Sequence, residues 1–256
     1  MENFIKFLGT AGARFVVTKQ LRASGGLWIS YRGTAVHLDP GPGALVRALS
    51  SRPALSPSSL GAILVSHRHI DHANDCNIMV EAMTEGGTKK RGLVFLPAEA
   101  LQGEPVLFGY LRETLEGVHT FEEGGEYRVG NITFQTPLRH VHSVETYGFR
   151  FLFSEGVVSV ITDTLFHEKL LEAYAQSHIL IIHTVRLKKE KHPQLLHLSA
   201  EEARILIEAI RPDLAVLTHF GMTMLQAKPW RVAEDLSQKT GLKVIAANDG
   251  LSLPLF

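Results

Sequence analysis

The chain has 256 residues, of which 45% are apolar and 20% are charged. It is therefore long enough to bury a substantial core, and its composition is that of an ordinary globular protein. Lys+Arg and Asp+Glu both number 26, so the formal net charge is zero. This balance excludes a global electrostatic field that would attract nucleic acid or an anionic membrane.

Cysteine content and the length of the apolar runs indicate the cellular compartment and whether the chain enters a membrane. The single cysteine, Cys76, excludes an internal disulfide and fits a reducing environment. Residues Met1–Lys6 lack the basic segment and apolar core of a signal peptide. Apolar runs such as Ile179–Ile182 are far too short to span a bilayer. We therefore expect a cytoplasmic monomer or homodimer with no membrane partner.

The first half of the chain alternates short apolar runs with turns and helical segments. Strands are predicted at residues 5–8, 27–31, 35–38, 62–65 and 92–96. Helical segments are predicted at residues 44–49, 73–85 and 97–101. The segment from Gly86 to Glu123 has the weakest pattern, and we interpret it as a candidate substrate-facing loop.

The second half begins with antiparallel strands and ends with alternating strands and helices. Strands are predicted at residues 127–129, 132–136, 149–153, 157–161, 179–182, 214–217 and 244–247, and helices at 168–175, 199–210 and 230–238. Ser199 and Glu202 form a capping box at the start of the second of these helices. Strands and helices are mixed in both halves and no linker divides the chain. The pattern predicts one layered α/β domain.

The segment Ser66–His72 carries the strongest chemical signal. It contains three histidines and an aspartate within six residues, directly after the predicted strand at 62–65. Imidazole nitrogens and carboxylate oxygens are the usual ligands of borderline divalent metals. Four ligands this close in sequence would strain the turn around a single ion. Two adjacent ions fit better, one on His67 and His69 and the other on Asp71 and His72.

Further ligand-type residues follow other predicted strands. They are His140 and His142 after the strand at 132–136, Asp163 after 157–161, and His219 after 214–217. Strand ends at one edge of a sheet converge on a common site, so separation in sequence is no obstacle. A lone histidine after a strand is more often structural than functional. The recurrence of such residues beside the segment 66–72 favours a shared metal site.

In this order, the residues resemble the metallo-β-lactamase superfamily of dinuclear metal hydrolases. The resemblance rests on His67-x-His69-x-Asp71-His72, His142, Asp163 and His219. It extends from the turn Gly9–Gly12 through Asp39-Pro40-Gly41 to Thr218–Gly221. It implies a four-layer αββα sandwich, formed by a single metallo-β-lactamase-like domain over residues 1–256. These motifs are specific for fold and metal but weak for substrate.

The resemblance also implies a ligand set for two divalent metal ions. One ion would be held by His67, His69 and His142, the other by Asp71, His72 and His219, with Asp163 bridging them. His142 is preferred to His140 because Tyr147-Gly148-Phe149 resembles the family's turn after that ligand. Asp39 is expected to orient a ligand imidazole, and Asp249 is a weaker candidate for the same role. Zinc is the expected metal, with manganese or iron as alternatives.

Two such ions would share a water and lower its pKa to about 7. The resulting bridging hydroxide would attack phosphorus or a carbonyl carbon. The resemblance gives Asp71 a second, catalytic role as the base that accepts a hydrogen bond from this hydroxide.

The element His197-Leu198-Ser199 resembles the His-x-Ser/Thr element of the phosphodiesterase branch, which includes tRNA 3′-end endonucleases. There the histidine lies near the leaving group, so a catalytic role as general acid is our hypothesis for His197. A histidine that merely precedes the helix is the alternative. Thr184 stands where this branch usually has an acidic residue, which would leave His197 without a partner. His183 is interpreted as supporting a ligand or as structural. The basic run 186–192 is interpreted as a solvated loop, with a lining of the phosphate entrance as the alternative.

The leading functional hypothesis is a phosphodiesterase that acts on a small or cyclic phosphodiester. The alternative enzyme is a carboxylic ester, thioester or lactam hydrolase with the same site. The alternative outside enzymes is a non-catalytic metal- or nucleic-acid-binding protein. Zero net charge and the lack of a long Gly/Pro-rich insertion make a nucleic-acid partner less favoured than a small molecule.

Overall fold

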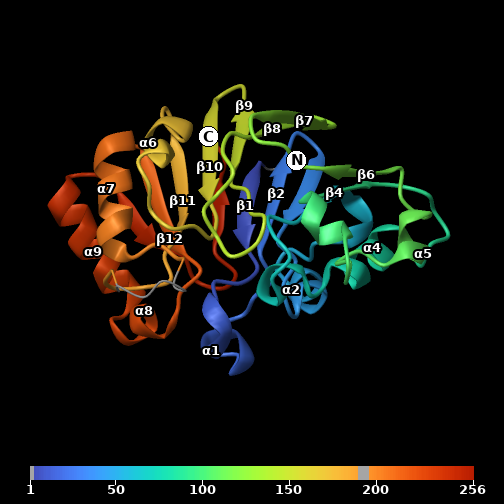
Figure 1. Cartoon of the computed structure of the whole chain (residues 1–256), viewed down its shortest axis with the longest axis horizontal. Coiled ribbons are helices and arrows are strands. Elements are labelled where there is room, and N and C mark those ends of the chain that lie inside the picture. The colour runs from blue at the N-terminus through green and yellow to red at the C-terminus, as the bar shows by residue number, and fades with distance from the viewer. Residues whose placement is uncertain (1–2, 190–195) are drawn as a thin grey trace.

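The computed structural model describes residues 3–189 and 196–256. Within them, two mixed seven-stranded sheets pack face to face, with helices on both outer faces (Figure 1). This is the four-layer αββα sandwich that the sequence predicted. No helix of the described residues is long and apolar enough to cross a membrane.

The first sheet has the strand order β14-β1-β2-β3-β4-β5-β6. Its strands are β1 (Phe4–Phe7), β2 (Leu27–Tyr31), β3 (Thr34–Leu38), β4 (Leu60–Leu64), β5 (Leu93–Leu96), β6 (Gly117–Thr120) and β14 (Ser252–Pro254). Strands β3 to β6 run parallel, so the carboxyl ends of β3 and β4 lie at the same edge. The outer face is covered by α2 (Ala44–Ser50), α4 (Cys76–Met83) and α5 (Gly109–Arg112).

The second sheet has the order β13-β12-β11-β10-β9-β8-β7. Its strands are β7 (Gly125–Val129), β8 (Ile132–Thr136), β9 (Phe149–Phe153), β10 (Gly156–Ile161), β11 (Ile179–His183), β12 (Leu214–Thr218) and β13 (Val244–Ala246). Strands β10 to β13 run parallel. The outer face is covered by α6 (Lys169–Ala173), α7 (Ala200–Ile210) and α9 (Pro229–Thr240).

The structure adds elements that the sequence pattern did not predict. They are α1 (Ala13–Thr18), α8 (Met222–Gln226), the short 3-10 helix η1 (Pro57–Ser59), α5, β6 and β14. The predicted turn at residues 97–101 is the 3-10 helix η2 (Ala98–Leu101). The helix predicted over 73–85 is divided into α3 (Ile70–Ala73) and α4. It is divided because the Asp75 backbone N–H donates to Pro40 O, at 2.9 Å, instead of continuing the helical ladder.

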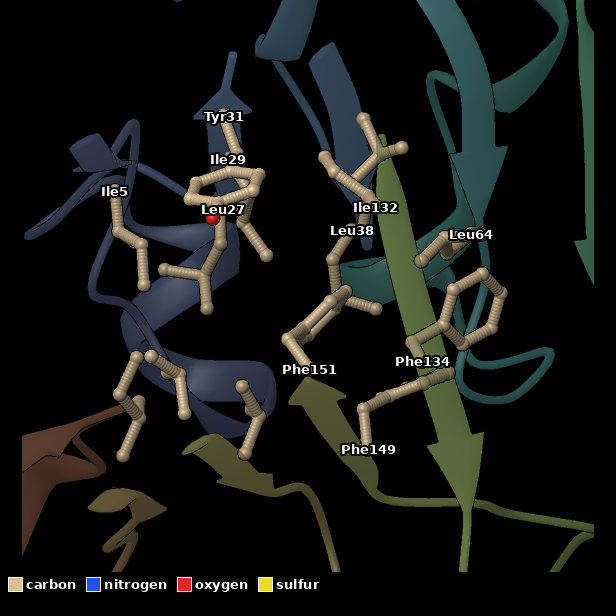
Figure 2. Packing of buried hydrophobic residues seen from close by; sticks show 14 of the residues in the cluster. Ile5, Leu27, Ile29, Tyr31, Leu38, Leu64, Ile132, Phe134, Phe149 and Phe151 are labelled. Carbon is tan, nitrogen blue, oxygen red and sulfur yellow. The ribbon is translucent and has the colours of Figure 1, made fainter. Parts of the chain in front are cut away.

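A cluster of aromatic and aliphatic side chains fills the space between the two sheets (Figure 2). Phe134, Phe149 and Phe151 are fully buried there, and their ring centroids lie 5.8–6.2 Å apart. Rings at these separations contribute both buried area and favourable ring contacts.

Replacing Phe134 with alanine is expected to lower the free energy of unfolding by about 3–5 kcal/mol, because the deleted ring leaves a cavity between the sheets. Chemical denaturation measures this change. The matched variant Phe108→Ala removes the same ring from a side chain that is 50% exposed. A loss for Phe134→Ala no larger than that for Phe108→Ala would contradict the packing described here.

Candidate metal centre

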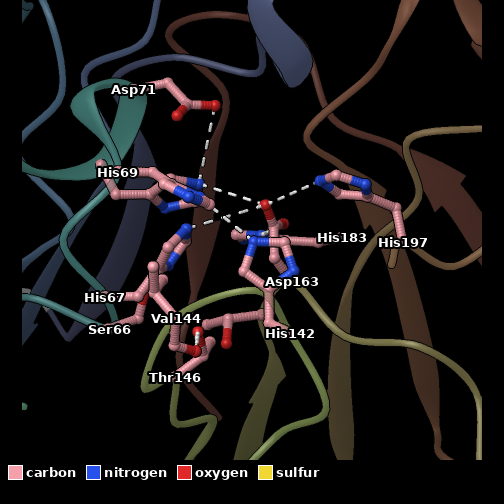
Figure 3. A network of polar contacts seen from close by, with 12 residues as sticks. Ser66, His67, His69, Asp71, His142, Val144, Thr146, Asp163, His183 and His197 are labelled. Carbon is pink, nitrogen blue, oxygen red and sulfur yellow. Dashed lines mark hydrogen bonds and ion pairs between the residues drawn. The ribbon is translucent and has the colours of Figure 1, made fainter. Parts of the chain in front are cut away.

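The polar side chains that follow the strands meet at one edge of the sandwich. Each comes from the carboxyl end of a different strand or the loop after it: Asp39 after β3, residues 66–72 after β4, His142 after β8, Asp163 after β10, His183 at the end of β11, and His219 after β12. Figure 3 shows several of these imidazoles directed toward the carboxylate of Asp163.

Asp39 fixes the shape of the loop after β4. The Ser66 backbone N–H donates to Asp39 Oδ1 at 2.6 Å, and the Ser66 hydroxyl donates to Asp39 Oδ2 at 2.7 Å. His72 Nδ1 lies 2.9 Å from the same Oδ2. Ser66 Oγ is also 3.0 Å from His67 Nδ1. Asp39 thus contacts the outer nitrogen of one imidazole and leaves the inner nitrogen, His72 Nε2, directed into the site.

A glycine allows this loop to approach its neighbour closely. A Cβ atom on Gly41 would lie 2.0 Å from the Asp71 carbonyl oxygen. Any side chain there would push the α3 turn away from the loop after β3. Gly41 therefore lets Asp39 reach Ser66 and His72.

The first group of potential ligands is formed by His67, His69 and His142. Each offers one ring nitrogen, and the three nitrogens lie within 4.8 Å of one another. His142 Nε2 is 3.1 Å from His69 Nδ1. His67 Nε2 is buried and has no hydrogen-bond partner among the described residues.

The second group is formed by His72, Asp163, His183 and His219, all of them buried. One ligand atom from each lies within 4.8 Å of the others. The imidazoles of His183 and His219 stack, with centroids 4.3 Å apart and planes 14° apart. Asp71 is not a member of this group, although its Oδ2 is 3.7 Å from both His72 Nε2 and His219 Nε2.

Asp163 lies between the two groups. Its Oδ2 is 4.0 Å from His67 Nε2, 3.5 Å from His72 Nε2 and 3.3 Å from His197 Nε2. Its Oδ1 is 3.3 Å from His219 Nε2 and 3.0 Å from His183 Nδ1. This carboxylate is 3% exposed, so the surrounding imidazoles and not water provide its contacts. The arrangement is that of a carboxylate able to bridge two cations.

The two alternative histidines of the sequence analysis are clearly separated. His142 belongs to the first group, whereas His140 has both ring nitrogens engaged elsewhere. His140 Nε2 is 2.7 Å from the Tyr174 hydroxyl, and its Nδ1 is 3.1 Å from Thr162 Oγ1. His140 therefore supports the neighbouring strand loop and offers no nitrogen to the site.

Burial keeps several imidazoles neutral. It lowers the pKa of His67 well below its usual value, and it lowers those of His142 and His183 to about 4. A neutral imidazole is the form that binds a metal ion. These three rings are therefore available as ligands at pH 7.

The pKa shifts of His72 and Asp163 show that the site favours a positive charge. Burial opposes protonation of His72, but Asp71, Asp39 and Asp163 outweigh it and raise its pKa well above the usual range. Burial would likewise raise the pKa of Asp163, but His219, His197 and His72 hold it well below its usual value. Asp163 therefore stays ionised and attracts a cation.

The residues present fit a pair of divalent metal ions. The buried Nε2 atoms of His67, His72 and His219 have no hydrogen-bond partner among the described residues. Unpartnered buried polar atoms are costly, and here they share one small region with an ionised carboxylate. Bound metal ions would satisfy all of them.

The structure also places the remaining candidates of the sequence analysis. A role was proposed for His197 from the sequence, whereas the role of His183 was left open. His197, which precedes the α7 cap at Ser199, lies against Asp163 and has its Nδ1 buried. The sequence left the role of His183 open, although it carries the same strand-end signal as Asp163 and His219. Among the described residues, Asp249 is bonded to the backbone and side chain of other loops: its Oδ1 accepts from the Thr10 hydroxyl and its Oδ2 from the Ala23 backbone N–H. Residues 190–192 of the basic run lie outside the described residues.

Comparison with known proteins identifies the family. Residues 34–220 match the model of the beta-lactamase superfamily domain. The chain belongs to the metallo-β-lactamase superfamily, a superfamily of metal-dependent hydrolases, as the sequence motifs predicted. The uncharacterized protein MJ1374 of Methanocaldococcus jannaschii is 34% identical over 259 residues, which cover 98% of this chain and 94% of that protein.

Solved structures share the whole fold. YhfI of Bacillus subtilis, a metallo-β-lactamase fold protein, superposes with a TM-score of 0.83 at 16% identity, over 99% of both chains. A diphosphatase of the PhnP family gives 0.72 at 20% identity, over 99% of this chain and 98% of that chain. The short form of human tRNase Z gives 0.71 at 15% identity, over 99% of both. At these identities the likeness establishes the fold, and it includes relatives of the phosphodiesterase branch.

Proposed function

We propose that this chain is a dinuclear metal-dependent phosphodiesterase that acts on a small or cyclic phosphodiester. The observation that carries the proposal is the position of Asp163, which lies between two groups of imidazoles and also against His197. A histidine at this place is suited to the leaving group of a phosphodiester, which needs a proton when it departs as an alkoxide. The resemblance to a diphosphatase and to tRNase Z supports chemistry at phosphorus.

The proposal assigns the ligands as follows. His67, His69 and His142 would hold one ion, and Asp71, His72 and His219 would hold the other, with Asp163 able to contact both. We propose zinc, with manganese or iron as alternatives. When bound, the two ions supply an activated water and positive charge for the reacting phosphate.

The protein's own groups then handle the protons. A carboxylate oxygen of Asp71 would accept a hydrogen bond from the attacking water and so orient it. His197 Nε2 gives its proton to the oxygen that leaves phosphorus. Asp39 keeps His72 oriented through the 2.9 Å contact with Nδ1.

The cytoplasmic location inferred from cysteine content stays a prediction.

Metal analysis combined with two chromogenic substrates tests this function. We expect close to two metal ions per chain, hydrolysis of bis(p-nitrophenyl) phosphate, and loss of that hydrolysis on chelation with recovery on addition of zinc. Turnover of p-nitrophenyl acetate alone would transfer the proposal to carboxylic esters, thioesters or lactams. A chain that binds metal but hydrolyses neither substrate would instead be a non-catalytic metal- or nucleic-acid-binding protein.

A further inference from the structure

His183 is a buried imidazole of the second ligand group that the proposed function leaves without a role. It is the last residue of β11, which pairs in parallel with β10 and β12. Asp163 follows the first of these neighbouring strands and His219 follows the second. The register places His183 opposite Thr218, the residue directly before His219. The backbone therefore fixes this imidazole beside two candidate ligands.

One ring nitrogen of His183 contacts the carboxylate of Asp163. His183 Nδ1 lies 3.0 Å from Asp163 Oδ1 (Figure 3). A carboxylate only accepts hydrogen bonds, so the His183 Nδ1–H is the donor. The other oxygen, Asp163 Oδ2, is the one that lies within 4.0 Å of ring nitrogens of His67, His72 and His197. His183 thus engages Oδ1 and leaves Oδ2 facing both candidate ligand groups.

The ring of His183 also stacks on His219, with centroids 4.3 Å apart and planes 14° apart. His219 has a φ of 59°, a left-handed conformation that residues other than glycine seldom adopt. Such conformations persist where the surrounding structure holds them. Here the Gly12 backbone lies so close that a Cβ atom on Gly12 would be 2.6 Å from His219 Cδ2, and His183 supplies the stacked ring. The direction of the His219 imidazole therefore depends on His183.

A small cavity shows how closely the second group is packed. Its volume is about 20 Å³, which is room for one water molecule, and its lining includes Asp71, His72, His183 and His219. Among the described residues, the lining includes no member of the first group. Removal of the His183 imidazole would enlarge this cavity and leave Asp163 Oδ1 without its hydrogen bond.

We propose that His183 is a positioning residue for one of the two ions, the one assigned to Asp71, His72 and His219 (the second position). The inference rests on the proposed two-ion site and not on the reaction carried out there. The hydrogen bond and the stacked ring of His183 both go to members of the second group, so loss of the imidazole affects that ion selectively. The ion assigned to the three imidazoles of the first group (the first position) keeps those ligands. Partners of this kind contribute about 10- to 100-fold to metal affinity.

Titration of the metal-free full chain with Co²⁺ tests this role without turnover, because the visible absorption of Co²⁺ follows each binding step. We expect the wild type to bind two ions. His69→Ala removes a ligand of the first group and so identifies the step that belongs to the first position. In His183→Ala we expect the affinity of the second position to fall by about 10- to 100-fold, while that of the first position stays within about threefold.

His183→Asn separates a positioning hydrogen bond from a merely structural ring. The amide nitrogen of asparagine is attached to Cγ, as Nδ1 is in histidine, so it can donate to Asp163 Oδ1 from nearly the same place. We expect this variant to return the affinity of the second position to within about threefold of the wild type. His37→Ala is the matched control, because it removes a buried imidazole that bonds to the Gly25 carbonyl and belongs to neither ligand group. It should keep both ions.

Equal weakening of both positions in His183→Ala, or no weakening of either, would overturn the proposal. So would a His183→Asn variant that binds the second ion no better than His183→Ala, because an amide donor replaces neither a metal ligand nor a packed ring. A wild type that binds fewer than two ions would also overturn it. If the variants behave as expected but the wild type does not hydrolyse bis(p-nitrophenyl) phosphate, the phosphodiesterase function fails and the positioning role stands.

Discussion

Replacement of Asp163 by alanine is expected to abolish turnover and to weaken metal binding by at least about 100-fold. Asp163 is the carboxylate within 4.0 Å of imidazoles from both candidate ligand groups, so its loss affects both metal positions. It also removes the negative charge that the buried imidazoles share. Metal content after gel filtration, and competition with a chelator of known affinity, measure the effect independently of activity.

Two further variants make this test specific. Asp163→Asn keeps the shape of the side chain but removes its charge, and it should also lose metal because an amide is a poor bridge. Asp249→Asn is the matched control, since the hydrogen bonds of Asp249 among the described residues go to Thr10 and Ala23 and not to a candidate ligand. Retention of two metal ions by Asp163→Ala would contradict the bridging role. Equal metal loss in Asp249→Asn would show that the effect is structural.

The fold and most of the candidate site were predictable because their signals are local. The apolar run before Ser66 indicates a buried strand, and the ligand-type residues crowd the loop directly after it. The capping box of Ser199 and Glu202 spans four residues of sequence, and both of its hydrogen bonds are present in the structure. Asp163 and His219 could be assigned to one site because each follows a strand, and the carboxyl ends of parallel strands lie at the same edge of a sheet.

What the sequence did not settle depends on contacts between distant segments. His183 carries the same strand-end signal as Asp163. Its position in the site is shown only by the structure, in which it lies 3.0 Å from Asp163 Oδ1 and stacks on His219. The sequence preferred His142 to His140 only by resemblance, whereas the structure separates them because the Tyr174 hydroxyl, from another part of the chain, bonds the His140 ring. Helix α1 was missed because its six residues follow a small-residue turn and are held by packing on α8 rather than by a periodic pattern.

Replacement of His197 by alanine is expected to have an effect that depends on the leaving group. A 2′,3′-cyclic nucleotide expels an alkoxide that needs a proton, so its kcat should fall by roughly 10²–10⁴-fold. p-Nitrophenolate leaves readily without a proton, so the loss with bis(p-nitrophenyl) phosphate should stay below about tenfold. His197 Nε2 lies 3.3 Å from Asp163 Oδ2, which places the proton donor beside the carboxylate that joins the two ligand groups.

This dependence separates a proton donor from a metal ligand. The nitrogens of His142 and His197 and a carboxylate oxygen of Asp163 also lie within 4.8 Å of one another, so His197 could itself bind an ion. A ligand role predicts metal loss and an equal fall in kcat for both substrates, whereas a proton donor keeps two metal ions and spares the nitrophenyl ester. His178→Ala, which removes an exposed imidazole packed near Phe256, is the matched control and should change neither rate. Equal losses on the two substrates with full metal content would contradict the general-acid role, because a positioning defect does not depend on how easily the leaving group departs.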